Sequence, residues 1–582
     1  MSDSRPLPAA VLVTLATTTV WALTPSMPHR SPPELASPSL RITPGAALIP
    51  GARWPQPQPP WDVMPGAADD SSASARKKAR KDWFAQMHRT SPGVDWRALE
   101  RDNGRRSLAR RNALAEGTLP PDTLPPDTLD ARWQERGSDN QAGRTHSAAV
   151  SPDGDQLYVG SALGGVWRGE LDGTGWAPLG DNLYGGAHQL LVSAGDTAGD
   201  PDIMLAASSW SWLHVSEDDG ATWQEPSGLP GVWRVVRLRK ASDEDAAVYT
   251  IIDNGYTATL SRSDDGGRSF TTVRELGAFP GSAGGWNDDV WVPRDGDSTV
   301  YAVVDGVVEV STDDGETWEV RGSPLAGAED DIQSLYLAGS EAGAPTLYLA
   351  VQTRAGSALH RSDDGGWTWT VAEPTMDDFW GALEASVVDA DLVVWGGVEA
   401  YRSTDGGASH TLINAWGQYY GDPAHKLHAD IMGIQATPDP EDPDEELWFI
   451  NTDGGSYISE DGAATVDNLA LQGLRISQYY DVLTSSVDPN HIAAGAQDQG
   501  YQLTTGLDQD DAVLQFTQAI SGDYGHLTSG DGSHSFVHSV YPGVMLTQEG
   551  EDEPVLHFSE FPRGATMGWL PMVVADPTDP EA

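Results

Sequence analysis

Short apolar runs separated by turn residues repeat along most of this 582-residue chain. From about residue 133, each repeat holds an apolar run, a turn, a second run, a Gly- or Asp-rich loop and a third run. Such runs predict β-strands, and helical patterning is scarce in this region. The pattern predicts an all-β fold built from four-stranded units. These units open near His146, His188, Trp233, Trp286, Asp331, Trp380, His428, Tyr479 and His526.

In six of the nine units the third run ends in one short phrase of Ser, Asp, Gly, Thr and Trp. Its copies are 216–223, 263–270, 311–318 and 362–369, with weaker forms at 403–410 and 459–466. Successive copies end 47, 48, 51, 41 and 56 residues apart (223, 270, 318, 369, 410, 466). A period in this range is typical of a β-propeller, in which four short strands make one blade. The Asp and Ser side chains of the phrase can bond backbone groups in a tight hairpin, so we expect a structural role for them.

This phrase resembles the Asp-box, and through it the chain resembles the BNR/Asp-box propeller superfamily. That superfamily includes sialidases, sortilin-type receptors and two-propeller xyloglucan-cleaving glycosidases. The resemblance implies that the phrase joins strands three and four of a blade, on the face opposite the ligand site. We expect about nine blades and a truncated tenth from Gly568, in one large ring or in one complete and one incomplete ring.

The chain before the repeats shows no strand pattern. A mostly apolar run follows Arg5 and is typical of a signal peptide, so we expect a secreted protein, extracellular or periplasmic. Trp83, Phe84 and Met87 have helical spacing in a basic segment. A second ring would begin near residue 470. The segments are therefore a signal peptide (1–24), a disordered Pro/Ala/Ser-rich linker (25–75), a basic helical leader with a Pro-rich spacer (76–129) and the propeller region (130–582).

The charge of the chain is strongly acidic and unevenly distributed. The formal net charge is −51 at pH 7, yet residues 76–111 hold 12 Lys and Arg against 4 Asp and Glu. An acidic body repels nucleic acid and anionic membranes, so we expect no nucleic-acid partner and a monomer. We expect the leader to dock on the acidic propeller, with a membrane-surface or nucleic-acid arm as the alternative. No apolar stretch is long enough to span a membrane, and the chain has no Cys for disulfides.

Candidate ligand-binding residues lie on the loops that the resemblance places opposite the phrase. Aromatic rings stack on pyranose faces, and a pair of carboxylates can supply the acid and the base or nucleophile of glycoside hydrolysis. Packing of the Trp rings between blades is the alternative. The candidates are Trp210, Trp212, Trp233, Trp286, Trp380, His428, Tyr479 and Tyr480.

The sharpest local motif is YYGDPAHKLHADI at 419–431, which opens a blade after a long loop. Xyloglucan-cleaving two-propeller enzymes carry a catalytic Asp at a similar blade opening, so the resemblance implies that Asp430 is an acid or base. Asp453 and Asp498 are the next catalytic candidates. His428 and Asp430 could equally be metal ligands or a structural hydrogen-bonded pair. We expect no metal and no cofactor.

These sequence features are compatible with two classes of function. The first is a secreted propeller that binds a neutral glycan or an extracellular protein without catalysis, as sortilin-type receptors do. The alternative is a xyloglucanase-like glycoside hydrolase that acts on neutral polysaccharide. A true sialidase is disfavoured, because the Arg-Ile-Pro motif of that family is missing and the acidic body would repel an anionic sugar. Two carboxylates about 5–10 Å apart in an open aromatic cleft would favour the hydrolase.

Overall fold

The computed structural model describes residues 73–118 and 135–579, with internal gaps. The gaps are 181–182, 184, 198, 209–211, 230, 233, 242–246, 279–287, 295–297, 305, 325–331, 506–512, 551–553 and 562–568. The predicted signal peptide, nearly all of the linker, the Pro-rich spacer and Gly568 therefore lie outside the described residues. In the described part, no helix combines the length and the apolar character that a membrane crossing requires.

Two helices come first among the described residues, and nearly every later element there is a strand. Helix α2 spans Ala73–Met87 and α3 spans Trp96–Ala115, where Asp95 caps α3 by accepting a hydrogen bond from the Arg97 N–H. A short 3-10 helix, η2, spans Trp416–Gly421. The strands form antiparallel sheets in sequence order, so the predicted all-β fold of four-stranded units is confirmed.

The sheets are numbered here as blades 1 to 9 in chain order. Blades 1 to 4 contain β1–β15: β1 Thr145–Val150, β2 Leu157–Ser161, β3 Val166–Gly169, β4 Ala177–Pro178; β5 Gln189–Ser193, β6 Ile203–Ser208, β7 Trp212–Ser216; β8 Arg234–Lys240, β9 Val248–Asp253, β10 Thr257–Ser263, β11 Thr271–Ala278; β12 Asp289–Trp291, β13 Val300–Val304, β14 Val307–Ser311, β15 Glu319–Gly322. Blade 2 has three named strands, and a bridge from Val215 to Gln224 supplies its fourth position.

Blades 5 to 9 contain β16–β35. Their bounds are β16 Ile332–Ser340, β17 Thr346–Thr353, β18 Gly356–Ser362, β19 Thr370–Glu373; β20 Ala382–Ala385, β21 Val393–Gly396, β22 Ala400–Ser403, β23 Thr411–Leu412; β24 Ile431–Pro438, β25 Glu446–Thr452, β26 Gly455–Ser459, β27 Asp467–Asn468; β28 Tyr479–Thr484, β29 Ile492–Ala496, β30 Gly500–Thr505, β31 Gln515–Ile520; β32 Gly525–Thr528, β33 Phe536–Tyr541, β34 Val544–Glu549, β35 Val555–Glu560. Among residues 569–579, the structure has one isolated bridge, between Asp576 and Asp579.

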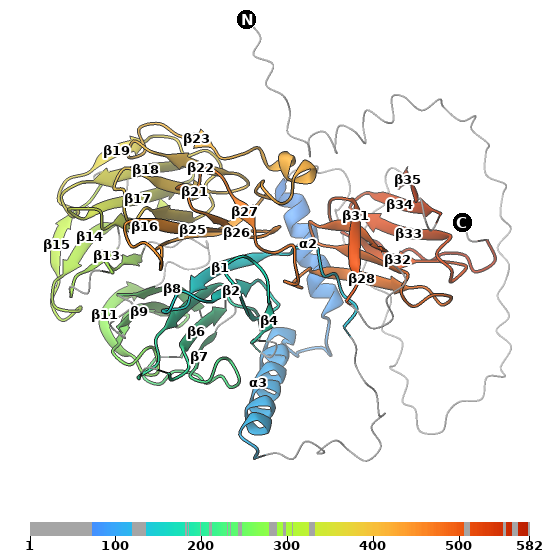
Figure 1. Ribbon diagram of the computed structural model, residues 1–582, viewed down its shortest axis with the longest axis horizontal. Helices are drawn as coiled ribbons and strands as arrows, with labels where there is room; N and C mark the ends of the chain where they lie inside the picture. Colours follow the sequence, from blue (N-terminus) through green and yellow to red (C-terminus); the bar gives the residue numbers. More distant parts are fainter. Residues whose placement is uncertain are drawn as a thin grey trace, which may run out of the picture.

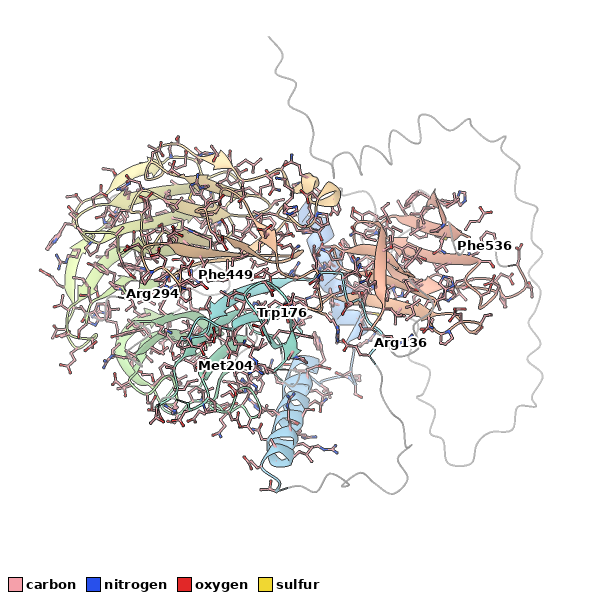
Figure 2. The ribbon with its side chains drawn as sticks, viewed as in Figure 1. Arg136, Trp176, Met204, Arg294, Phe449 and Phe536 are labelled. Carbon is pink, nitrogen blue, oxygen red and sulfur yellow. The ribbon has the colours of Figure 1, made fainter. Side chains whose placement is uncertain are left out.

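Blades 1 to 7 close into one ring, and blades 8 and 9 form a separate two-blade unit (Figure 1). The first strand of each ring blade contacts the first strand of the next, and β24 contacts β1 to close the circle. Blade 8 contacts blade 9 through β28 and β32. Figure 2 shows Arg294 and Phe449 inside the ring and Phe536 in the two-blade unit. Of the two arrangements expected, the structure has one complete and one incomplete ring.

The ring closes by burying apolar residues between blades 7 and 1. Leu157, Val159 and Trp167 of blade 1 pack against Leu447 and Phe449 of blade 7 in one cluster, all of them buried. Strands in second position, such as β6 and β9, are buried along their whole length because blades pack on both of their faces. Hydrophobic burial on both faces therefore holds the blades in a rigid ring.

The repeated phrase forms the hairpin after the third strand of blades 2 to 7. In blade 4, Ser311 Oγ donates to Asp313, the Gly315 N–H donates to Ser311 Oγ, and Asp313 accepts two bonds from Thr317. These hydrogen bonds to the charged form lower the pKa of Asp313. The same bonds recur in the other five copies, which explains why Ser and Asp keep their spacing.

The ring and the two-blade unit are joined by the segment that leads into β1. The Asp139 N–H donates to the Leu514 carbonyl at 2.9 Å. The side-chain amide of Asn140 donates to the Phe516 carbonyl and accepts a hydrogen bond from the Phe516 N–H. Helix α2 lies between the two bodies, and α3 lies against the ring (Figure 1). Asn112 of α3 donates to the Trp223 carbonyl at 2.8 Å, so the leader is tied to blade 2.

Candidate functional site

Three predicted carboxylates meet around one guanidinium between the ring and the two-blade unit. Asp430 precedes β24, Asp453 lies in the β25–β26 loop and Asp498 lies in the β29–β30 loop. Arg144, which precedes β1, binds both carboxylate oxygens of Asp453 through Nε and Nη2. The same Nη2 lies 3.4 Å from Oδ2 of Asp498. Loops from blades 1, 7 and 8, distant in the sequence, are thereby brought to one point.

The backbone at this point adopts conformations that few L-residues tolerate. Asp430, Asp498 and His526 have φ values of 65°, 60° and 54°. Asp is among the side chains that tolerate this left-handed region, yet such residues cost free energy and persist only where the surroundings hold them. The Asp430 N–H donates to the Val398 carbonyl at 3.0 Å, which holds the turn in place. Left-handed non-glycine residues gather at functional sites, and here two of them carry candidate carboxylates.

Burial and mutual charge separate the pKa values of the three carboxyls. Burial and the charge of Asp498 raise the pKa of Asp453 well above its ordinary value. Burial alone would also raise the pKa of Asp498, but a hydrogen bond with Asp453 and the charge of Arg144 hold it below the ordinary value. Burial, followed by the charge of Asp498, raises the pKa of Asp430 to about 6. Asp453 and Asp498 therefore titrate as a coupled pair beside Arg144, in which Asp453 takes up a proton more readily than Asp498.

Aromatic residues and a fourth carboxyl surround this cluster. Tyr480 donates through its hydroxyl to Asp523 Oδ1 at 3.1 Å, and burial with the charge of Asp498 raises the pKa of Asp523 to about 6. The hydroxyl of Tyr419, in η2, donates to Gln499 of blade 8 at 3.3 Å. Burial raises the pKa of Tyr420 to about 12, so this hydroxyl stays protonated. The 419–431 motif therefore links the ring to the two-blade unit.

His428 is buried beside the cluster in a neutral state. Its Nδ1 bonds the Ala429 carbonyl at 3.0 Å, and its ring meets Tyr419 edge to face, with 4.7 Å between centroids. Burial lowers the pKa of His428, and its Nε2 has no hydrogen-bond partner among the described residues. In the described part of the chain, no three His, Asp or Glu side chains are arranged to hold a metal ion.

Helix α2 covers part of this aromatic surface. The Trp83 indole meets Tyr480 and His526 edge to face, with centroids 5.7 and 6.0 Å apart. Phe84 lies 6.3 Å from Tyr480, and the charge of Arg80 counteracts the raised pKa of Asp523. The basic leader therefore lies against the acidic site through aromatic and electrostatic contacts.

The remaining predicted ligand residues are placed differently. Trp212 is buried in β7, stacks on His214 and is covered by Arg105 of α3, whose guanidinium carbon lies 4.5 Å from the ring centroid. Tyr479 donates its hydroxyl to Ser138 at 2.7 Å and lies between blade 8 and the entry segment. Trp210, Trp233 and Trp286 lie outside the described residues.

Trp380 is exposed at the opening of blade 6, on the edge of the carboxylate cluster. Nearly half of its surface, 47 %, is accessible. Its side chain bonds Asp378, and the charge of Asp378 contributes to the raised pKa of Asp430. Two of the predicted Trp residues are described, Trp212 and Trp380. Trp212 is buried, so of these two it is Trp380 that offers an exposed aromatic ring.

Sequence reasoning left three residues of this cluster out of the site. Arg144 stands at the opening of a first strand, the class of position that supplied the other candidates. Asp523 lies between a Gly and a Tyr near the opening of blade 9, and this position is only a weak indication of a site residue. Nothing in the sequence places Trp83 against Tyr480, because that contact joins two distant segments.

Comparisons with known proteins add to this geometry. No protein-family model matches the chain. An oligoxyloglucan-reducing end-specific xyloglucanase from Emericella nidulans is 32% identical over 193 residues, which cover 30% of this chain. The chain spans only 23% of the length of that curated relative.

Two solved structures of GH74 enzymes share the architecture. The Niastella koreensis enzyme superposes with a TM-score of 0.52 at 15% identity, covering 76% of this chain and 70% of its own. An ancestral GH74 enzyme gives a TM-score of 0.54 at 13% identity, covering 74% and 64%. Similarity at this level of identity establishes the fold alone, and the chain is a β-propeller protein.

Proposed function

We propose that this chain is a glycoside hydrolase that cleaves a neutral polysaccharide of the xyloglucan class. The observation that carries the proposal is the meeting of Asp430, Asp453 and Asp498 around Arg144. The pKa of Asp430 is raised to about 6 and that of Asp498 is lowered, on one surface between the ring and the two-blade unit. Titratable groups whose surroundings push their pKa values apart are the mark of acid and base roles.

The two carboxyls have complementary roles in this proposal. Asp430, protonated below about pH 6, donates its proton to the glycosidic oxygen as the bond to the sugar carbon breaks. Asp498 stays ionised, stabilises the developing positive charge of the sugar and accepts a proton from the attacking water. Asp453 is a positioning residue, because it is 1 % exposed and joins Asp498 to Arg144.

Charge and aromatic surface support a neutral sugar as substrate. The chain carries a net charge of −51, which repels anionic sugars. Trp380 offers an exposed ring on which a pyranose face can stack, and Tyr480 offers a second ring when Trp83 is displaced from it. The named relative acts on xyloglucan oligosaccharides, which are neutral, and this similarity favours hydrolysis over binding alone. We also propose secretion, for which residues 1–24 would be the signal.

Hydrolysis of xyloglucan oligosaccharides by the full chain tests the proposal. Asp430→Asn and Asp498→Asn each remove an ionisable group at constant shape and should lower the release of reducing ends by at least about 100-fold. The matched control is Asp467→Asn on β27, because this carboxylate is 72 % exposed and lies in the same blade as Asp430. If the wild type releases reducing ends and both site variants release them equally fast, the assignment of Asp430 and Asp498 is refuted.

Glycan binding without catalysis is the second candidate function, and one observation favours it. The surface beside the carboxylates already holds an aromatic side chain, Trp83, against Tyr480. Such a surface can bind a ligand whether or not the carboxyls act on it. Calorimetric binding of oligosaccharides with no release of reducing ends would support this candidate in place of the hydrolase.

A further inference from the structure

The axis of the seven-bladed ring contains a second polar region, formed by residues other than the three carboxylates of the candidate site. Two cavities of about 280 and 170 Å³ lie there, and the first strands of the ring blades line them. The cavities adjoin, because five residues line both of them. These are His188, Gln189, Arg239, Glu384 and Gln435.

The lining of these cavities is cationic although the chain is acidic. Five Lys or Arg side chains line them, against two carboxylates, Asp289 and Glu384, which leaves an excess of three positive charges (5 − 2). Asp253 does not line the cavities, but its charge acts on Arg234. If Asp253 is counted, the excess is two positive charges. The cations are Arg234, Arg237, Arg239, Lys240 and Arg294.

Nearby histidines do not change this balance at neutral pH. His146 and His188 line the larger cavity and stack on each other, with ring centroids 3.8 Å apart. Burial lowers the pKa of His188 to about 4 and holds that of His146 well below its ordinary value. Both rings are therefore neutral, and the excess charge comes from the Lys and Arg residues alone.

A single strand supplies four of the five cations. Strand β8 reads Arg-Val-Val-Arg-Leu-Arg-Lys, and its pairing with β9 shifts register between Val235 and Arg237. The extra residue at this shift brings Arg234 to the same face as Arg237 and Arg239. Val235, Val236 and Leu238 are buried in the core. The bulge therefore concentrates charge on the face that lines the cavities.

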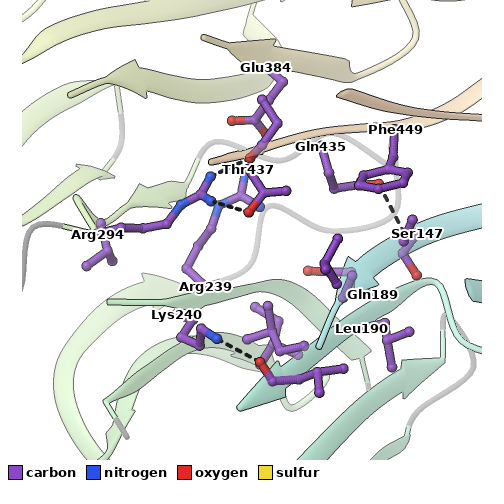
Figure 3. A pocket seen from close by; sticks show the side chains of 18 of the residues that line it. Ser147, Gln189, Leu190, Arg239, Lys240, Arg294, Glu384, Gln435, Thr437 and Phe449 are labelled. Carbon is purple, nitrogen blue, oxygen red and sulfur yellow. Dashed lines mark hydrogen bonds between the residues drawn. The ribbon is translucent and has the colours of Figure 1, made fainter. Parts of the chain in front are cut away.

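Two of the guanidinium groups point toward the same space. Arg294 donates to the Ala436 carbonyl and to Thr437 Oγ1, and Arg239 approaches the same point from β8 (Figure 3). Within the described residues, Arg239 makes no hydrogen bond and no ion pair, although its charge acts on Glu384. Arg237, by contrast, forms an ion pair with Asp289 at 2.7 Å.

Glu384 supplies one negative charge beside the two positive charges of Arg239 and Arg294. Burial raises the pKa of Glu384 above its ordinary value in spite of the charges of Arg239, Arg294 and Arg237 around it. Burial also lowers the pKa of Arg234 to about 10, an effect to which Arg237 adds. Uncompensated positive charge in a cavity of low dielectric is unfavourable unless an anion joins it.

We propose that the ring channel binds a small, multiply charged oxyanion of the phosphate class between Arg239 and Arg294. Guanidinium groups match tetrahedral and planar oxyanions through paired N–H donors. Arg294 donates two of its five N–H groups to Ala436 and Thr437, which leaves three for a ligand. The smaller cavity, of about 170 Å³, has room for an ion of this size. Such an ion joins the neighbouring blades 3 and 4 on the inner side of the ring and stabilises the closed ring.

Titration of the full chain with inorganic phosphate tests the proposal, with sodium chloride keeping ionic strength constant. Calorimetry should give saturable binding, and the melting temperature should rise with phosphate concentration. Arg239→Gln should weaken binding at least about tenfold. Glu384→Gln removes an opposing charge and should tighten binding, a result that damage to the fold cannot imitate. Arg321→Gln, at an arginine of similar exposure outside the channel, should leave binding unchanged.

Several results would overturn the proposal. No saturable heat and no rise in melting temperature with phosphate at constant ionic strength would refute the site. Binding that is the same in Arg239→Gln and Glu384→Gln as in the wild type would place the anion elsewhere. Binding of citrate but not of phosphate would replace the phosphate class by a polycarboxylate. None of these outcomes depends on whether the carboxylates near Arg144 hydrolyse a sugar.

Discussion

Asp453 of the ring and Asp498 of the two-blade unit share a hydrogen bond across the boundary between the two bodies. Burial raises the pKa of Asp453, while the hydrogen bond with Asp453 and the charge of Arg144 lower that of Asp498. The loop of blade 7 therefore depends on the loop of blade 8 for its charge balance. A site with this construction is complete only when the ring and the two-blade unit are held together.

Loss of Arg144 should destabilise the chain strongly. Arg144→Gln leaves Asp453 buried without its bidentate partner, and breaking such a pair costs about 3 kcal/mol of the free energy of unfolding. Adding Asp453→Asn removes the stranded carboxyl and should restore part of the loss. Urea unfolding of the two single variants and the double variant measures this coupling. Equal losses in Arg144→Gln and in the double variant would contradict it.

Activity should fall as pH rises through about 6. Asp430 must carry a proton to act as the acid, and its pKa is raised to about 6. Above that value the rate should drop about tenfold per pH unit, because the protonated fraction drops by that factor. A profile of kcat/KM from pH 4 to 9 measures this fall in rate directly. A rate that stays level up to pH 8 would exclude Asp430 as the acid.

Asp430→Asn should stabilise the protein at neutral pH. The folded pKa of Asp430 lies above the unfolded value, so ionisation costs stability as pH rises from about 4 to 6. A neutral amide avoids this cost, with an expected gain of about 1–3 kcal/mol at pH 7 that vanishes near pH 4. Unfolding by urea at both pH values provides the comparison. An equal gain at pH 4 would mean that the effect comes from shape and not from charge.

Removal of the Trp83 side chain should uncover the candidate site. Trp83→Ala breaks edge-to-face contacts with Tyr480 and His526, each of which contributes about 0.5–1.5 kcal/mol. We expect oligosaccharide affinity to rise, up to about tenfold, because Tyr480 becomes free to stack. Trp96→Ala on α3 is the control, since that ring stacks on His88 and not on Tyr480. Weaker affinity in Trp83→Ala would show that the indole is part of the binding surface.

The repeat pattern predicted the fold well because each blade is a local unit. Openings expected at His146, His188 and Tyr479 lie within one residue of the first residues of β1, β5 and β28. The hairpin phrase carries its own hydrogen bonds, so its position could be read without tertiary contacts. Closure after seven blades could not be predicted, because it depends on how Phe449 packs against Leu157 across the ring.

The candidate site was predictable only in part. Asp430, Asp453 and Asp498 stand at loop positions that the blade pattern defines, and these three do meet in space. The contact of Trp83 with Tyr480 joins segments about 400 residues apart, and no local pattern encodes it. The arginines of β8 were hidden from pattern reasoning because the register shift at Val235 breaks their alternation.

Catalysis by Asp430 is tested most directly by the release of reducing ends from xyloglucan oligosaccharides by purified wild type, Asp430→Asn and Asp467→Asn at pH 5. At this pH most of Asp430 is protonated, because its pKa is about 6. We expect release by the wild type and by Asp467→Asn, and a loss of at least about 100-fold in Asp430→Asn. Equal release by all three proteins, or none by the wild type on any neutral oligosaccharide, would contradict this expectation.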